Sequence, residues 1–411
     1  MTDEQSTDVL TRRRLLRTGG VVGTGGVAGA AGATLVREPL PAAPDPQTGT
    51  WPLAHRGPRN TARIPRATPP DDPAVRTVST TEDPTTLVVG GAGEVRRIVV
   101  GGYSRVAAHE PDGSVAWRGP ESDALAIRPG LGQCYLAAAD GSLREHALGD
   151  GRVRWETDLV HESVFSVVPT TDGLFVPFNG GIDAYDAEGE HRYTVSHGDG
   201  IGYAGVAIGD EDGVYVTDVG MVERLAPRSL LDELRGRPPP AEWRVEDGLS
   251  FSRAPIVEGD EVYVTHEREG GRGGVVAADA SGSVRWWREL GDRPVGAALG
   301  PERLFVGMGG RGSNGDDETP DRPYRLYALD RGDGSTVWST DPSAYYADPV
   351  VAGETLLARE GTNGGEGRVR AFERDGQLRW TVDLDGNAMG IAPVRDRVYA
   401  VTDDGSLRVL S

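Results

Sequence analysis

From about residue 75 to the C-terminus, short apolar runs alternate with polar turns according to a fixed plan. Each unit opens with a run such as Ala254–Val257, continues with one such as Val262–Val264, and then has a run that ends in aspartate, such as Leu326–Asp330. An Asp-Gly or Ser-Gly turn leads into a fourth run that carries an aromatic residue, as in Ser283–Trp286. Short runs of this composition, bounded by glycine turns, are typical of strands joined by tight hairpins. Each unit is therefore predicted to form four strands.

The unit recurs with a period of about 40 residues, which is the spacing of a repeat protein. Trp243 belongs to the series, although an insertion from about Ser229 to Ala241 replaces its turn. In the other units a glycine stands four residues before the aromatic residue, at Gly113/Trp117, Gly151/Trp155, Gly189/Tyr193, Gly282/Trp286, Gly334/Trp338 and Gly376/Trp380. Four short strands per repeat, without a helical pattern, predict the blades of a β-propeller.

Eight blades are expected. Seven units end in the aromatic residue, and an eighth, from about Gly390 to Leu410, stops after its third strand. Ala74–Val78 would supply the missing outer strand, because joining both ends of the chain in one sheet removes an exposed edge. The fold class is thus an all-β, eight-bladed β-propeller of four-stranded antiparallel blades, closed by an N-terminal outer strand and spanning residues 74–411. Residues 37–73 are rich in proline and are expected to form an extended lead-in on the surface of the domain.

Residues 1–36 resemble a twin-arginine signal peptide. Arg12 and Arg13 follow a threonine and precede Arg14 and two leucines, and residues 18–36 carry no charge. Ala31-Gly32-Ala33 offers a cleavage site of the Ala-x-Ala type. We therefore expect an exported protein, extracellular or at the cell surface. An uncleaved N-terminal membrane anchor stays open as the alternative.

Composition excludes several classes of chemistry. All 43 basic residues are arginine, so the chain has no lysine for a Walker A loop, a kinase site or a pyridoxal phosphate Schiff base. The net charge of −20 argues against nucleic-acid binding, which needs a basic surface. With Cys134 as the single cysteine, an intramolecular disulfide and a thiolate metal cluster are excluded. This acidic, arginine-only composition is similar to that of halophilic proteins.

The repeat resembles that of pyrroloquinoline-quinone-like propellers, and in architecture it is closest to the BamB-like group. The lead-in Trp51…Arg56-Gly57…Asn60-Thr61 also resembles the opening of that family. The resemblance covers residues 51–411 and implies that outer-strand aromatic residues dock between neighbouring blades. This role then falls on Trp117, Trp155, Trp243, Trp286, Trp338 and Trp380, with Tyr193 as a weaker substitute.

The family also contains quinone-dependent alcohol dehydrogenases, which hold the quinone with a vicinal cysteine pair and a calcium ion bound by carboxylates. Cys134 has no neighbouring cysteine and is expected in a buried second strand of its blade. We therefore expect no quinone with calcium, and no catalytic, cofactor-binding or metal-binding residues.

Three other patterns are interpreted as structural. Gly307-x-Gly309-x-x-Gly312 follows a strand but lacks the helix that a dinucleotide loop requires. The acids that follow it lack the alternating spacing of a calcium loop, so a solvated insertion is favoured. His109 and His146 precede equivalent turns, which favours a role in repeat packing over metal binding.

We expect an exported, non-catalytic β-propeller that serves as a protein-binding or scaffolding module in the cell envelope or outside the cell. Its partner would be an extracellular or envelope protein that docks on one face of the ring or on the insertions Ser229–Ala241 and Gly309–Pro323. A monomer is expected, with membrane contact only if the signal stays uncleaved. Two alternatives remain open: a quinone- or metal-dependent oxidoreductase with its site in the central channel, and a cell-surface structural protein.

Overall fold

The computed structural model describes residues 37–38, 50–53, 57–92, 95–122, 124–128, 130–197, 205–210, 213–251, 253–268, 272–291, 293–309, 324–340, 345–361 and 367–411. Arg12, Arg13 and the insertion from 310 to 323 lie outside these residues. Within them, no helix is long and apolar enough to cross a membrane.

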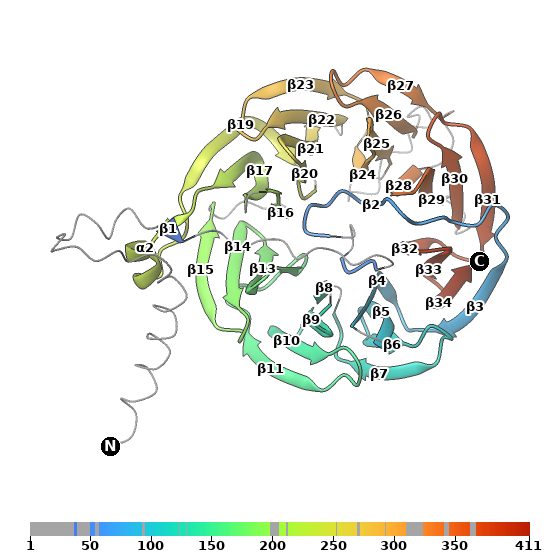
Figure 1. The fold of residues 1–411 in the computed structure, drawn as a ribbon, viewed down its shortest axis with the longest axis horizontal. Helices are drawn as coiled ribbons and strands as arrows, with labels where there is room; N and C mark the ends of the chain where they lie inside the picture. Colours follow the sequence, from blue (N-terminus) through green and yellow to red (C-terminus); the bar gives the residue numbers. More distant parts are fainter. Residues whose placement is uncertain are drawn as a thin grey trace, which may run out of the picture.

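Eight antiparallel blades stand around a central axis, so the predicted fold class is confirmed (Figure 1). In blades 1 to 7, chain order runs from the innermost strand of a blade to its outermost strand. Blades 1 to 3 consist of β4 (Pro84–Ala92), β5 (Val95–Gly102), β6 (Val106–His109) and β7 (Val115–Gly119); β8 (Ala124–Arg128), β9 (Gln133–Ala137), β10 (Ser142–Ala147) and β11 (Val153–Asp158); and β12 (Val168–Pro169), β13 (Gly173–Phe178), β14 (Gly181–Asp186) and β15 (His191–Ser196).

Blades 4 and 5 share one sheet. Blade 4 contains β16 (Gly205–Ile208), β17 (Val214–Leu225) and β19 (Ala241–Phe251), and β17 supplies both middle positions because its first part pairs with β16 and its second part with β19. The end of β19 also pairs with β21, which joins the two blades. Blade 5 consists of β20 (Ile256–Glu258), β21 (Glu261–Arg268), β22 (Arg272–Asp279) and β23 (Val284–Glu289).

Blade 8 closes the ring as expected. Its outermost strand is β3 (Val75–Thr80), which pairs with β34, and Ala74 and Ser411 exchange backbone hydrogen bonds of 3.0 and 3.1 Å. Blades 6 to 8 consist of β24 (Pro294–Leu299), β25 (Arg303–Met308), β26 (Leu326–Asp330) and β27 (Thr336–Ser339); β28 (Tyr345–Ala352), β29 (Thr355–Gly361), β30 (Gly367–Glu373) and β31 (Leu378–Leu384); and β32 (Ala388–Val394), β33 (Arg397–Thr402), β34 (Ser406–Leu410) and β3.

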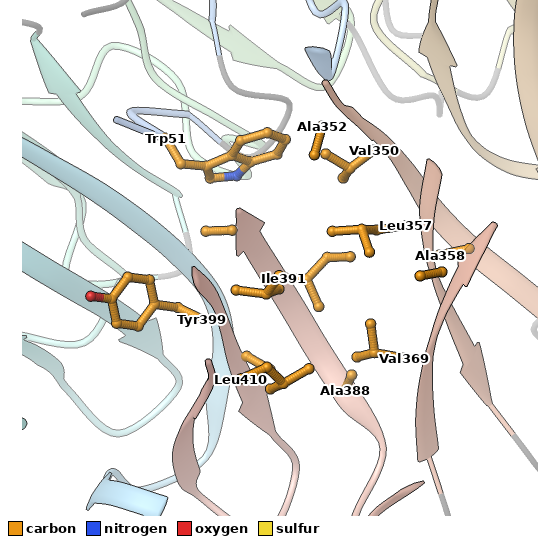
Figure 2. Close-up of a cluster of buried hydrophobic side chains, with 14 of the residues drawn as sticks. Trp51, Val350, Ala352, Leu357, Ala358, Val369, Ala388, Ile391, Tyr399 and Leu410 are labelled. Carbon is orange, nitrogen blue, oxygen red and sulfur yellow. The ribbon is translucent and has the colours of Figure 1, made fainter. Parts of the chain in front are cut away.

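The core lies between blades, where the apolar faces of neighbouring sheets pack together. The largest cluster joins inner and middle strands of blades 1, 6, 7 and 8, with Ile391, Leu357 and Leu410 among its buried members (Figure 2). Because small residues such as Ala358 and Ala392 alternate with these large ones, adjacent sheets can approach closely. Each sheet is thereby buried on both faces near the axis.

The insertion in blade 4 forms a short appendage, which we call the blade 4 insertion (residues 228–240). It contains β18 (Arg228–Ser229) and the one-turn helix α2 (Leu230–Leu234). The strand β1 (Arg37–Glu38) pairs antiparallel with β18. This part of the N-terminal region therefore docks at the rim of the ring, beside blade 4 (Figure 1).

The expectation that the lead-in lies on the surface was wrong for much of its length. Trp51, Leu53, Ala62, Ile64 and Ala67 are all buried. We call residues 50–53 and 57–73 the axial strap; it includes β2 (Arg63–Ile64), which pairs in parallel with β28. Proline-rich composition suggested an exposed segment, but the strap is held mainly by its backbone carbonyls, which side-chain periodicity does not reveal.

Candidate functional site

The axial strap makes a circuit of the ring and contacts every blade in chain order. Leu53 joins the apolar cluster that includes Val167 beside blade 3. The other seven blades are reached by backbone hydrogen bonds of 2.6–3.0 Å near the C-terminal ends of their innermost strands: Trp51 with Val89, Pro52 with Ile127, Pro58 with Ile208, Arg59 with Val257, Thr61 with Leu299, Ala62 with Val351, and Thr68 with Arg395. The strap thus satisfies backbone groups that would otherwise lie unpaired at this end of the channel.

Trp51 anchors the start of the strap. Its backbone N–H and C=O both bond to Val89 of β4, at 2.6 and 2.7 Å, and its side chain is only 2% exposed. The indole belongs to the same buried cluster as Val350 and Ala352 of β28, the innermost strand of blade 7, and lies close to them in Figure 2. The axis at this end is therefore filled by the chain itself.

Asn60 ties the strap to the seam between blades 4 and 5. Its side-chain amide donates to the carbonyls of Val206 and Pro255, at 2.9 and 3.0 Å, and its backbone φ of 56° lies in the left-handed region that asparagine tolerates better than most residues. Beside it, Thr265 and Tyr263 help to line a cavity of about 20 Å³, enough for roughly one water molecule. The cavity is too small for an organic ligand.

An ionic network fixes the strap to blades 5 and 6. Arg63 pairs with Glu258, which also accepts a hydrogen bond of 3.0 Å from Arg331 of blade 6. Arg331 pairs with Glu261 as well and donates to the carbonyls of Gly300 and Pro301. Because these groups are mostly buried, the network holds its partners in one geometry rather than as loose surface pairs.

At the outer seams, the tryptophans predicted to dock between blades share one geometry. Each indole Nε1 donates to a backbone carbonyl in the turn before the outermost strand of the next blade, except that Trp380 reaches the strap. The bonds run from Trp117 to Leu148 (2.9 Å), Trp155 to Ala187 (3.1 Å), Trp243 to Ala280 (2.7 Å), Trp286 to Arg331 (2.8 Å), Trp338 to Arg374 (2.9 Å) and Trp380 to Pro70 (2.8 Å).

Tyr193 occupies the equivalent position in blade 3 but contacts its neighbour differently. Its side chain is 5% exposed, and the guanidinium of Arg228 lies over the ring, 4.4 Å from the centroid. Arg228 belongs to the blade 4 insertion, which replaces the usual turn. A cation–π contact therefore stands where the other seams have an indole hydrogen bond.

Blade 4 also contains a buried charge cluster that no sequence pattern indicated. His197 contacts Asp218 through Nδ1 (3.2 Å) and Glu223 through Nε2 (2.8 Å), and Glu223 also pairs with Arg244 at 2.8 Å. A ring nitrogen must carry a proton to donate to a carboxylate, so this geometry fits the doubly protonated imidazolium. Burial disfavours that charge, but the hydrogen bonds with Asp218 and Glu223 outweigh it and raise the pKa of His197 to about 9.

The histidines of blades 1 and 2 have the packing environment expected of them. His109 and His146 are buried and contact the carbonyls of Gly113 and Gly151 in their own turns. His146 also stacks on Trp117 of the preceding blade, with ring centroids 5.6 Å apart. Burial lowers the pKa of both histidines, which favours the neutral ring.

The residues described do not fit a quinone–calcium pair. Cys134 is fully buried in β9, and burial raises the pKa of its thiol to about 12. Across the described part of the chain, no cluster of three or more His, Cys, Asp or Glu side chains is placed to hold a metal ion. Neither the reactive thiols nor the carboxylate ligands of such a pair are therefore assembled among these residues.

Comparisons with known proteins place the chain in a family. A search of curated proteins found no match. Among solved structures, the chain is similar to BamB from Moraxella catarrhalis (15% identity, TM-score 0.61, covering 82% of this chain and 100% of that one). It is also similar to the quinohemoprotein alcohol dehydrogenase ADHIIG from Pseudomonas putida HK5 (12%, 0.64, 88% and 80%) and to Sqt1 from Saccharomyces cerevisiae (10%, 0.62, 81% and 98%). At these identities the likeness shows the fold alone.

The family assignment rests on a match of the amino-acid sequence. Residues 102–298 and 322–411 match the family described as outer membrane protein assembly factor BamB, and these two ranges make up more than half of the chain. The protein belongs to this family of repeat propellers.

Proposed function

We propose that the protein is an exported, non-catalytic β-propeller that binds another protein in the cell envelope or outside the cell. Membership of a family described as an assembly factor supports a binding role. The twin-arginine-like segment with Arg12 and Arg13 supports export. An acidic surface would keep such a protein soluble in the salt-rich surroundings that its composition suggests.

The axial strap is the observation that carries this proposal. It fills the end of the channel at which the first and second strands of each blade are joined, and it does so with buried residues such as Trp51 and Ile64. That end serves to hold the ring together. The opposite, strap-free end carries the loops between blades and the turns between second and third strands, and it is the surface left for a partner.

Two exposed apolar side chains, Tyr103 and Val160, lie at the strap-free end. Tyr103 is 70% exposed in the turn between β5 and β6, and Val160 is 49% exposed in the loop between β11 and β12. Aromatic residues in particular supply much of the binding energy at protein interfaces. The partner is expected to contact this end of the ring near blades 1 to 3.

The test is affinity capture from native envelope at high salt, with wild-type protein and two variants compared. A partner recovered with the wild type should be lost with the double variant Tyr103→Asp, Val160→Asp. Leu131→Asp is the matched control, because Leu131 is 57% exposed in the β8–β9 turn at the strap end. Equal recovery with all three proteins would contradict a partner site at the strap-free end.

A quinone-dependent oxidoreductase is the second candidate, because a quinohemoprotein alcohol dehydrogenase has the same fold over 88% of this chain, although no cluster of metal-binding side chains is present among the described residues. The test is addition of quinone with calcium to the purified protein. Stoichiometric quinone absorbance together with alcohol oxidation would replace the binding proposal. Absence of quinone binding at saturating calcium would remove the enzyme candidate.

A further inference from the structure

The blade 4 insertion presents an apolar and cationic face to solvent. In the one-turn helix α2, Leu231 is 42% exposed and Leu234 is 80% exposed. Arg235 and Arg237 follow directly and are also exposed. The chain as a whole is acidic, with a net charge of −20, so an exposed face made of leucine and arginine has the opposite charge and is more apolar than expected for its surface.

The acids of the same segment are engaged in local contacts. Ser229 Oγ donates to the carboxylate of Asp232 at 2.6 Å and accepts from the backbone N–H of Asp232 at 3.1 Å. The hydrogen bond from Ser229 lowers the pKa of Asp232. Glu233 pairs with Arg192 of blade 3 at 3.1 Å. Asp232 also forms an ion pair of 3.8 Å with Arg237, whose side chain stays 60% exposed. Because ion pairs balance both acids and the pair with Arg192 fixes the helix to the ring, the two leucines and Arg235 are left facing outward.

The chain itself connects this face with an apolar segment. Residues 18–36 contain no charged residue over nineteen positions, and β1 (Arg37–Glu38) begins where they end. β1 pairs with β18, which leads directly into α2. The uncharged segment therefore ends at residue 36, immediately before the strand β1, which lies against the blade 4 insertion.

We propose that the blade 4 insertion rests on a membrane surface with anionic headgroups. Leu231 and Leu234 enter the interface between headgroups and acyl chains, while Arg235 and Arg237 contact the phosphates. This goes beyond the proposed function, because it assigns a lipid contact at the rim and leaves the strap-free end to the protein partner. At molar salt the arginine contribution is largely screened, and the leucine contribution remains.

The contact can be measured with the full chain and a fluorophore at one position. Leu234→Cys provides the labelling site, and the buried thiol of Cys134 stays unlabelled in the folded protein. With vesicles that contain phosphatidylglycerol, an environment-sensitive label at residue 234 should shift its emission to the blue and be quenched by brominated acyl chains. Leu131→Cys, at the strap end, is the matched control and should show neither effect.

Because the label is at residue 234, its response to changes at Arg235 and Arg237 distinguishes contact by the blade 4 insertion from membrane binding by the apolar N-terminal segment alone. Adding Arg235→Gln and Arg237→Gln to the labelled protein should lower its affinity for the vesicles, obtained from a quenching titration at low salt, about fivefold per arginine, in line with roughly 1 kcal/mol per basic residue near an anionic surface. Arg66→Gln, which neutralises an exposed arginine of the strap, should leave the affinity unchanged.

Two results would overturn the proposal. One is a label at residue 234 that stays as exposed to water as the label at residue 131. The other is a blue shift that appears equally without vesicles, which would mean that another protein surface covers the leucines. Capture of the partner through Tyr103 and Val160 is measured separately, so failure of either proposal leaves the other readout intact.

Discussion

The indole ring of Trp286 lies so close to Gly334 of the next blade that a Cβ at Gly334 would be 2.5 Å from Cε3 of the ring. The same approach recurs at four other seams, where an added Cβ would lie 2.6–2.8 Å from the ring: Gly151 on Trp117, Gly189 on Trp155, Gly282 on Trp243 and Gly376 on Trp338. The glycine that shapes the hairpin turn therefore also provides the surface on which the neighbouring tryptophan packs.

Gly334→Ala should destabilise the protein by roughly 2–4 kcal/mol, because the methyl group meets the ring and φ is 70°. Gly259→Ala is the matched control: φ is 59°, but no atom lies within 4 Å of the added Cβ, so a loss of about 1 kcal/mol is expected. The measurement is urea unfolding at a fixed high salt concentration. Equal losses for the two variants would show that only backbone conformation matters at Gly334.

Trp51→Ala should lower the free energy of unfolding by about 3–5 kcal/mol, because it removes a buried ring from the largest core cluster. Arg66→Ala, at an exposed strap position, should change it by less than about 0.5 kcal/mol. Both are measured by urea unfolding. A Trp51 variant as stable as the Arg66 variant would mean that the strap contributes little to the closed ring.

His197 should make stability depend on alkaline pH. Its pKa of about 9 in the folded protein exceeds the ordinary value of 6.5, so its contribution is fully present below pH 6.5 and is lost as pH rises through 9. A loss of roughly 3 kcal/mol is expected over that interval. The measurement is the free energy of unfolding at a series of pH values.

His197→Gln should flatten this alkaline dependence. His146→Gln is the control, because burial lowers the pKa of His146 and its contribution is lost in the opposite direction, as pH falls. If the His197 variant keeps the same alkaline slope as the wild type, another group is responsible for it.

Cys134 should be unreactive in the folded protein. Its thiol is fully buried and its pKa is raised to about 12, so almost no thiolate forms near neutral pH. A thiol reagent should modify the protein only at the rate of unfolding, giving one modified site per chain. Rapid modification in native conditions would show that blade 2 opens locally.

Arg12→Lys together with Arg13→Lys should abolish export if the N-terminal segment is a twin-arginine signal. Arg17→Lys, which also exchanges one basic residue for another, should leave export unchanged. The measurement is the fraction of protein recovered outside the cell. Unchanged export of the double variant would contradict the assignment of this signal.

Strand order and ring closure could be predicted because the repeat places equivalent residues at equivalent points, so one well-marked unit explains the others. The position of the strap could not be predicted, because the strap is held by hydrogen bonds that its backbone carbonyls, such as those of Pro58 and Ala62, accept from distant strands. Backbone carbonyls are present at every residue and leave no pattern in the sequence. The charge cluster around His197 was missed for a related reason. Its members lie on three segments, and only the hairpin of blade 4 brings Glu223 and Arg244 together.

The route of the strap also sets an order of events during synthesis. Residues 50–73 leave the ribosome before any blade exists, yet Thr68 bonds to Arg395, which is among the last residues made. The strap can therefore complete its circuit only when the chain is nearly finished. Until then, backbone groups near the C-terminal ends of the innermost strands lack the strap as their hydrogen-bonding partner. Other strands could pair with these groups, so the unfinished chain must be kept from such contacts.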